Sequence, residues 1–213
     1  MPRSAGASKH PKTTSGGVVR ALPFVGDDVD LVLALRAGHP GAPGALFERH
    51  AVHVQRVLAR VLGPDPELGD LLHDVFLRAL GGIRRLEDPA ALCGWLTSIA
   101  VFTARGCIRR RRARRWLRFL SAEQIPDREA PVASPEQMDA LRRTYEILDR
   151  LPANERIAFA LRVIDGMELT EVAQACGVSL ATIKRRLSRA QESFVAMARR
   201  EPALAEWVEG GAR

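Results

Sequence analysis

The sequence predicts an all-α protein made of two small helical domains joined by a flexible linker, the second of which carries a helix-turn-helix. Apolar residues recur at the spacing of amphipathic helices, and no stretch alternates long enough to suggest a sheet. Only 5% of the 213 residues are aromatic, whereas leucine, alanine and arginine abound. Three prolines, Pro126, Pro131 and Pro135, break the helical pattern between the two domains.

Four helices are expected in the first domain, residues 27–118, because residues that start or stop helices flank each apolar stripe. The first helix, 27–37, is capped by Asp27 or Asp28 and ended by Gly38 and Pro40, and the second, 46–62, is stopped by Gly63-Pro64. The third, 68–80, is opened by Asp65-Pro66-Glu67 and closed by Gly81-Gly82. After a loop at 83–87, Asp88-Pro89 opens the fourth helix, which runs from Leu92 into a block of arginines.

The arginine block spans residues 105–118, which contain eight arginines and no acid in a chain of net charge +7. A solvated positive helix end, which the helix dipole favours, is the simpler explanation. Eight arginines exceed what that role needs, so the favoured interpretation is neutralisation of phosphate groups.

Residues 119–135 form the expected linker, and residues 136–200 form the second domain. A capping box at Ser134-Pro135-Glu136-Gln137 opens a helix that runs to Leu151, and Pro152 opens another that closes at Gly166. The remaining segments, 1–26 and 201–213, are expected to be tails, the first of them flexible and basic.

Residues 166–187 read as two short helices joined by a tight turn. Gly177 stands where the chain must leave the first helix with positive φ, and Ser179 offers an N-cap to the second. Ile183 and Leu187 belong to the buried stripe of this second helix. Its other side carries Ser179, Thr182, Lys184, Arg185, Arg186, Ser188 and Arg189.

Such a basic face suits a helix that lies in the major groove of DNA, although a two-helix corner with a solvated face is the alternative. Basic elements in both domains predict contact with two separated DNA segments.

No set of residues typical of catalysis or of a cofactor site is present, so neither an enzyme nor a cofactor is expected. His50 and His53 lie three residues apart without a third metal ligand, so no metal site is predicted. The cysteines, Cys93, Cys107 and Cys176, are expected to be buried free thiols in a reducing cytoplasm. No apolar run approaches the ~20 residues that span a bilayer, and no insertion into a membrane is expected.

Two sets of motifs in this order resemble the extracytoplasmic-function sigma factors of bacterial RNA polymerase, in the sigma-70 superfamily. The motifs that resemble region 2 are Leu31 to Gly38, Phe47 to His50, Asp70 to Leu80 and Trp95 to Ala100; those that resemble region 4 are Leu148 to Pro152, Glu155-Arg156, Leu169 to Ala173, Gly177 to Ser179 and Thr182 to Ala190.

The resemblance implies a sigma factor that binds core RNA polymerase and promoter DNA, recognises −35 and −10 elements and assists DNA melting. An anti-sigma factor is a further partner that it allows. It assigns polymerase binding to Asp70, Leu71, His73, Asp74 and Leu77, the −10 element to Arg84, Arg85, Arg105, Arg109, Arg110 and Arg112, and the −35 element to the seven residues from Ser179 to Arg189 given above. The helices near Leu151–Ile164 would meet the polymerase flap.

The sequence departs from the family pattern in region 2. Members usually have an Asn and an Asp after the Ile-Ala pair, where this chain has Phe102 or Thr103 and Gly106, and His73 replaces a frequent Gln. These changes leave the −10 preference open. The main alternative is a DNA-binding helix-turn-helix regulator that does not join polymerase; an anti-sigma factor is disfavoured, because its frequent His-x₃-Cys-x₂-Cys zinc site is absent.

Overall fold

Eight α-helices account for most of the described chain. The computed structural model describes residues 24–118, 135–201 and 204. The helices are α1 (Asp28–Ala37), α2 (Ala42–Leu62), α3 (Leu68–Gly82), α4 (Leu92–Arg118), α5 (Pro135–Arg150), α6 (Ala153–Phe159), α7 (Leu169–Cys176) and α8 (Leu180–Ala198). Within these ranges there is no β-strand, which confirms the all-α prediction. The predicted tails and linker lie largely outside the described residues, as does the capping box at 134–137.

Several helix ends follow the predicted local chemistry. Asp27 caps α1 in a capping box with Asp30, and Gly38 ends it with a φ of +77°. The predicted stop at Gly81-Gly82 is confirmed, because α3 ends at Gly82 and a 3₁₀ turn, Ile83–Arg85, follows. The helix expected to close at Gly166 changes its geometry before that residue: α6 ends at Phe159 and continues as one π-helical turn, Ala160–Ile164.

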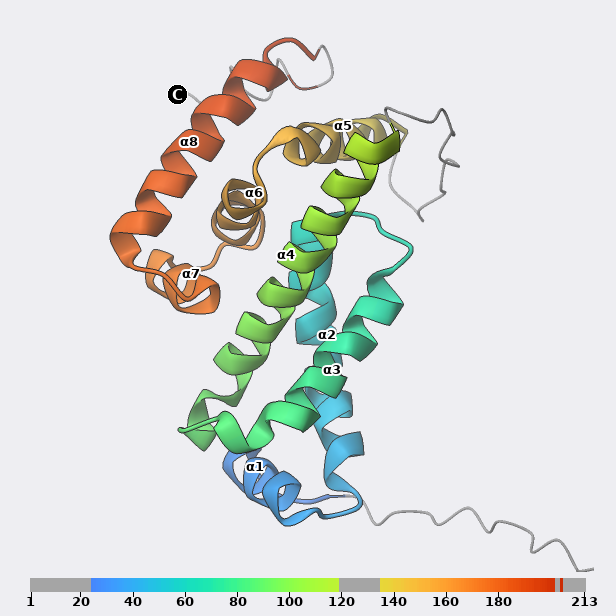
Figure 1. Cartoon of the computed structure of the whole chain (residues 1–213), viewed down its shortest axis with the longest axis vertical. Helices are drawn as coiled ribbons and strands as arrows, with labels where there is room; N and C mark the ends of the chain where they lie inside the picture. Colours follow the sequence, from blue (N-terminus) through green and yellow to red (C-terminus); the bar gives the residue numbers. More distant parts are fainter. Residues whose placement is uncertain (1–23, 119–134, 202–203, 205–213) are drawn as a thin grey trace, which may run out of the picture.

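The core of the first domain forms where α4 packs across α2 and α3, with α1 closing one end (Figure 1). Leu31, Leu46, Leu58 and Leu96 have no exposed surface there. In the second domain, α6 and α8 pack together, and the rings of Phe159 and Phe194 stack with centroids 4.7 Å apart.

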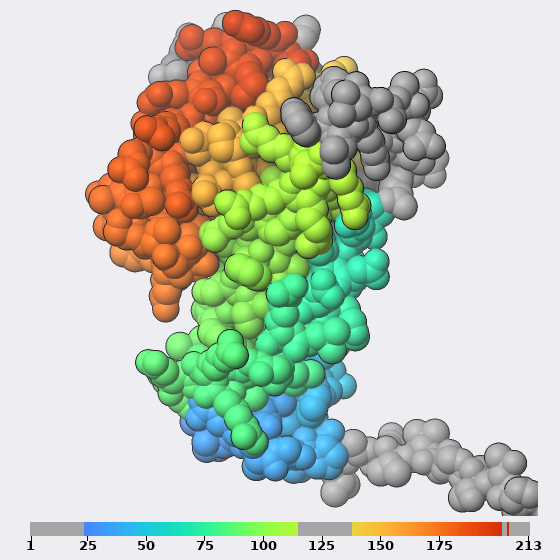
Figure 2. Space-filling model, viewed as in Figure 1, coloured from blue at the N-terminus to red at the C-terminus, as the bar shows by residue number. Residues whose placement is uncertain are grey.

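The two domains also pack against each other. The largest cluster of buried apolar residues is continuous from Leu31 in α1 to Ile183 in α8, and α7 lies along α4. The surface view shows the segment of α7 against the side of α4 (Figure 2). The predicted flexible linker led us to expect two domains without contact between them, so the sequence analysis did not anticipate this interface.

One described helical stretch, Pro89–Arg114, is long and apolar enough to cross a membrane by length and composition. Half of its most apolar part is buried against the other helices, as in the core helix of a globular fold. Cys107 and Cys176 are buried as predicted, but the prediction is wrong for Cys93, which is exposed near the start of α4.

Candidate nucleic-acid interface

Helices α7 and α8 form the predicted helix-turn-helix. After α7, Gly177 adopts a φ of +65° in the left-handed region, which glycine enters without steric cost. The side-chain oxygen of Ser179 accepts a hydrogen bond from the N–H of Thr182 at 3.3 Å and caps α8. Both local predictions are confirmed. A capping box between Glu168 and Glu171, which the sequence analysis did not identify, begins α7.

The outer face of α8 is basic and accessible. Ile183 and Ala190 have no exposed surface and fix the helix to the core. Thr182 is half-buried, and the hydroxyl of Ser188 donates a hydrogen bond to Glu192 at 2.8 Å. The exposed residues of the predicted −35 set are Ser179, Lys184, Arg185, Ser188 and Arg189.

Arg186 differs from its neighbours on α8. It is half-buried, and its Nη1 atom is covered without a hydrogen-bond partner among the described residues. Burial raises the pKa of the Cys176 thiol, and the nearby charges of Arg105 and Arg186 oppose that rise. Arg186 is therefore partly covered by the protein in this structure, although the prediction had assigned it to DNA.

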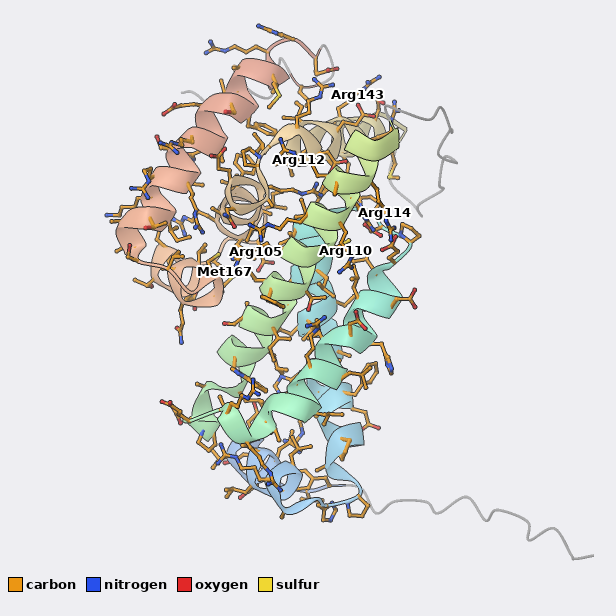
Figure 3. The ribbon with its side chains drawn as sticks, in the orientation of Figure 1. Arg105, Arg110, Arg112, Arg114, Arg143 and Met167 are labelled. Carbon is orange, nitrogen blue, oxygen red and sulfur yellow. The ribbon has the colours of Figure 1, made fainter. Side chains whose placement is uncertain are left out.

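The arginines of α4 fall into two groups. Arg109, Arg110, Arg112 and Arg114 are exposed, and Figure 3 shows the last three of them along the C-terminal half of the helix. Arg84 and Arg85 are exposed in the turn after α3. The side chains of Arg115 and Arg118 lie outside the described part of the chain.

Arg111 belongs to the second, structural group. Its guanidinium binds the carboxylate of Asp65 through both Nη atoms and lies 3.3 Å from Glu67. Burial alone would raise the pKa of Asp65, but hydrogen bonds from Arg111 and from the Glu67 N–H outweigh it and lower that pKa. The same bond raises the pKa of Arg111. Arg111 thus fixes the start of α3 to α4.

Arg105 is also engaged within the protein, although the resemblance assigns it to the −10 element. Its Nη2 donates to the carbonyl oxygen of Cys176 at 3.4 Å, and its Nε is buried without a partner among the described residues. Figure 3 shows Arg105 on the side of α4 that faces α7. In this structure Arg105 therefore joins the two domains and is not free to meet a phosphate.

The predicted polymerase-binding residues on α3 separate by face. Asp70, His73, Asp74 and Leu77 are exposed. Leu71 is only 3% exposed and packs in the core, so its assignment as a contact residue is wrong for this structure. Leu71 is part of the apolar stripe that holds α3 to the domain.

Phe102 is a surface feature that the sequence analysis noted only as a departure from the family. Its ring is 60% exposed on α4, and the guanidinium of Arg78 lies 5.7 Å from the ring centroid. An exposed aromatic ring beside guanidinium groups is a surface on which unpaired bases stack. The sequence could have indicated this surface, because Phe102 lies only two helical turns before Arg109 on the same predicted helix.

His50 and His53 both have partners within the protein. His50 is buried and lies 3.2 Å from Asp28, and His53 lies 2.8 Å from the hydroxyl of Thr97. Burial lowers the pKa of His53. Among the described residues no group of three or more His, Cys, Asp or Glu side chains is placed to hold a metal ion.

Two family descriptions match the chain in order. The description "Sigma-70 region 2" matches residues 46–117, and "Sigma-70, region 4" matches residues 141–192. The first match covers most of α2 to α4, and the second covers α6, α7 and parts of α5 and α8.

Curated relatives cover most of the chain. RNA polymerase sigma factor CnrH of Cupriavidus metallidurans is 30% identical in an alignment of 184 residues that covers 80% of this chain and 95% of that protein. ECF RNA polymerase sigma factor SigM of Mycobacterium tuberculosis is 29% identical over 164 residues, 77% of this chain and 81% of SigM. The ECF RNA polymerase sigma-E factor of Escherichia coli K12 is 26% identical in an alignment of 176 residues that covers 78% of this chain and 92% of that protein.

Solved structures share the fold. The structure of CnrH in complex with the cytosolic domain of CnrY has a TM-score of 0.57 and 24% identity, covering 82% of this chain and 98% of that one. The sigma factor RpoE in complex with the anti-sigma factor NepR from Bartonella quintana has a TM-score of 0.53 and 22% identity, covering 71% of this chain and 92% of that one.

Proposed function

The chain belongs to the extracytoplasmic-function sigma factors of the sigma-70 family, and we propose from this that it binds core bacterial RNA polymerase and directs it to specific promoters. The observation that carries the proposal is the ordered pair of matches to regions 2 and 4, each with exposed arginines on a helix. The protein acts as a transcription initiation factor and not as an enzyme, in the cytoplasm where polymerase works. An anti-sigma factor is a further partner of this class of protein.

Reconstitution with core polymerase tests this function. The full chain should be retained by immobilised core enzyme, and the assembled holoenzyme should give runoff transcripts from a subset of genomic promoter fragments that core enzyme alone does not transcribe. A chain that bound promoter DNA but neither bound core enzyme nor supported transcripts would instead be a regulator that acts without joining polymerase.

We assign region 2 to residues 27–118 and region 4 to residues 136–200, with promoter melting and −10 contacts in the first and −35 recognition in the second. The exposed arginines of α4 and of the turn after α3 support the −10 assignment, and the exposed basic face of α8 supports the −35 assignment. The exposed face of α3 then remains for the clamp of the polymerase.

Asp74→Arg should weaken the affinity for core polymerase by about tenfold or more, because it reverses a charge that we place against a basic partner surface. Asp74 is exposed, so the free energy of unfolding should change by less than about 0.5 kcal/mol. A core-binding titration and a denaturant titration measure the two effects. Glu192→Arg, the same charge change on α8, is the matched control; equal affinities for both variants would exclude α3 as the docking helix.

Arg185→Ala should relax the preference at one or two −35 base pairs, since a bidentate arginine–guanine contact contributes about 1–3 kcal/mol of discrimination. Lys184→Ala should instead weaken binding to all sequences alike, because phosphate contacts position without specifying. Binding of the holoenzyme to a set of single-base −35 variants distinguishes these patterns. A uniform loss with Arg185→Ala would make that residue a phosphate contact and pass base recognition to Arg189 or Thr182.

Replacing Arg109 and Arg110 together with alanine should lower the salt dependence of promoter binding by about one unit of slope per lost phosphate contact. The preferred −10 sequence should not change. The control is the double change Arg199→Ala and Arg200→Ala, which removes the same charge from exposed positions beyond α8. A changed −10 preference would show that Arg109 or Arg110 reads bases.

A further inference from the structure

The chain between α3 and α4 carries Arg84 and Arg85, two of the arginines that we assign to the −10 element. This connecting segment, residues 83–91, consists of two short 3₁₀ turns with an extended stretch between them. Arg84 and Arg85 are exposed, whereas Ile83 and Leu86 are each only 5% exposed. The two apolar side chains therefore fix the segment to the domain and leave both arginine side chains accessible.

A side chain from α1 also holds the connecting segment. Leu86 has a φ of −70° and a ψ of 109°, so it has left the 3₁₀ turn before it, and its carbonyl oxygen needs a donor from elsewhere. Arg36 in α1 supplies that donor: its Nη2 atom donates to the carbonyl oxygen of Leu86, 50 residues later in the chain. Figure 1 shows α1 beside the connection between α3 and α4, and α1 contacts both 3₁₀ turns.

Helix α1 is a firm support for this contact. Leu31 and Val32 have no exposed surface and pack in the core of the first domain. Both ends of the helix are capped, by Asp27 and by Gly38. Arg36 lies in the last turn, between the buried residues and the C-terminal cap, so its backbone is fixed from both sides. Its guanidinium group therefore limits how far the connecting segment can move.

The hydrogen bonding of Arg36 itself is incomplete. Its side chain is half-buried, and its Nε atom is covered without a hydrogen-bond partner in the part of the chain that the structure describes. A covered donor without a partner costs free energy, so an arginine that served stability alone would be expected to pair it. The bond to the carbonyl oxygen of Leu86 is kept in spite of this cost, which favours a role for the bond in placing the segment.

We propose that Arg36 is a positioning residue for −10 recognition, because its bond to Leu86 holds the connecting segment in one conformation. That conformation presents Arg84 and Arg85 to promoter DNA. The proposal rests on the proposed function, which assigns both arginines to the −10 element. A segment that is ordered in the free protein loses less freedom on binding, so the same contacts with DNA give a higher affinity. Without its support, the segment has to be ordered during binding and the affinity falls.

Arg36→Met tests the positioning role, because methionine keeps an unbranched side chain but has no donor for the carbonyl oxygen of Leu86. In the free chain, amide hydrogen exchange should become faster at residues 83–91 and stay unchanged in α3 and α4. In the holoenzyme, the affinity for labelled single strands that span the −10 element of a transcribed promoter should fall about three- to tenfold. The affinities for core polymerase and for duplex −35 DNA should not change.

A double-mutant cycle separates positioning from a general structural effect. Because Arg36 acts through the two exposed arginines, Arg36→Met should have no further effect on single-strand affinity in a chain that already carries Arg84→Ala and Arg85→Ala. Arg36→Lys should recover part of the wild-type affinity, since an ammonium group still donates to one carbonyl oxygen. Arg49→Met is the control for lost charge. Arg49 lies 3.7 Å from Asp28 on the other side of α1's first turn, and its replacement should leave the affinity unchanged.

Unchanged hydrogen exchange at residues 83–91, losses that simply add in the cycle, or an equal loss with Arg49→Met would each overturn the positioning role and leave the sigma function intact. Arg36→Gln, with a shorter neutral side chain that water can solvate, takes the place of Arg36→Met if circular dichroism shows that the methionine variant does not fold. Failure of the wild-type chain to bind core enzyme would instead contradict the proposed function.

Discussion

Arg156→Ala is expected to lower the free energy of unfolding by about 3 kcal/mol. Arg156 is almost fully buried and donates to two carbonyl oxygens at the end of α2 and to the carboxylate of Asp149. Each buried acceptor left without a donor costs about 1–3 kcal/mol. The shift in the urea midpoint at constant slope measures the change.

Arg156→Lys should recover part of this loss, because one ammonium group cannot reproduce the planar fork that reaches three acceptors. Arg143→Ala is the control: its ion pairs with Asp139 and Glu146 lie on the surface of α5, and such pairs contribute about 0–1 kcal/mol. A loss under about 1 kcal/mol for Arg156→Ala would mean that water replaces the guanidinium at the end of α2, as it would if the domains were apart.

Gly63→Ala is expected to have an effect of similar size, about 3 kcal/mol. Gly63 has a φ of +80° and a ψ of −163°, a region that glycine alone enters readily, and a side chain there costs about 1–3 kcal/mol. A Cβ atom would also lie 2.6 Å from a ring carbon of Tyr145. The ring would have to move, and its hydroxyl would lose the carbonyl oxygens at the end of α2.

Gly38→Ala separates the two causes. Gly38 has a φ of +77°, but an added Cβ would meet nothing within 4 Å. It should cost about 1–2 kcal/mol from backbone conformation alone. Thermal or chemical unfolding of both variants gives the comparison; equal losses would show that Tyr145 does not pack on Gly63 in solution.

Local chemistry explains what could be predicted from the sequence. The cap at Asp27, the left-handed turns at Gly38 and Gly177 and the N-cap at Ser179 each depend on residues within a few positions of one another. Such interactions are encoded in short windows. The same holds for the outward face of α8, because helical periodicity alone separates Ile183 from Arg185.

The contacts between domains could not be predicted in this way. Arg156 finds its acceptors 94 and 95 residues earlier in the chain, and Arg105 finds its acceptor 71 residues later. A basic residue on a helix looks alike in sequence whether it caps a distant helix or meets a phosphate. Leu71 was misassigned for a related reason: a motif match names a stretch of residues, whereas burial divides that stretch by face.

The end of α2 has a consequence for engineering chimaeras. Its last carbonyl groups take donors from Tyr145 in α5 and Arg156 in α6, so one domain completes the secondary structure of the other. A graft that brings in a foreign second domain to change promoter choice would remove these donors, unless the donor sequence has a tyrosine and an arginine at the equivalent positions. Compatibility of grafted halves therefore depends on α5 and α6, and not only on α8, the helix to which we assign −35 recognition.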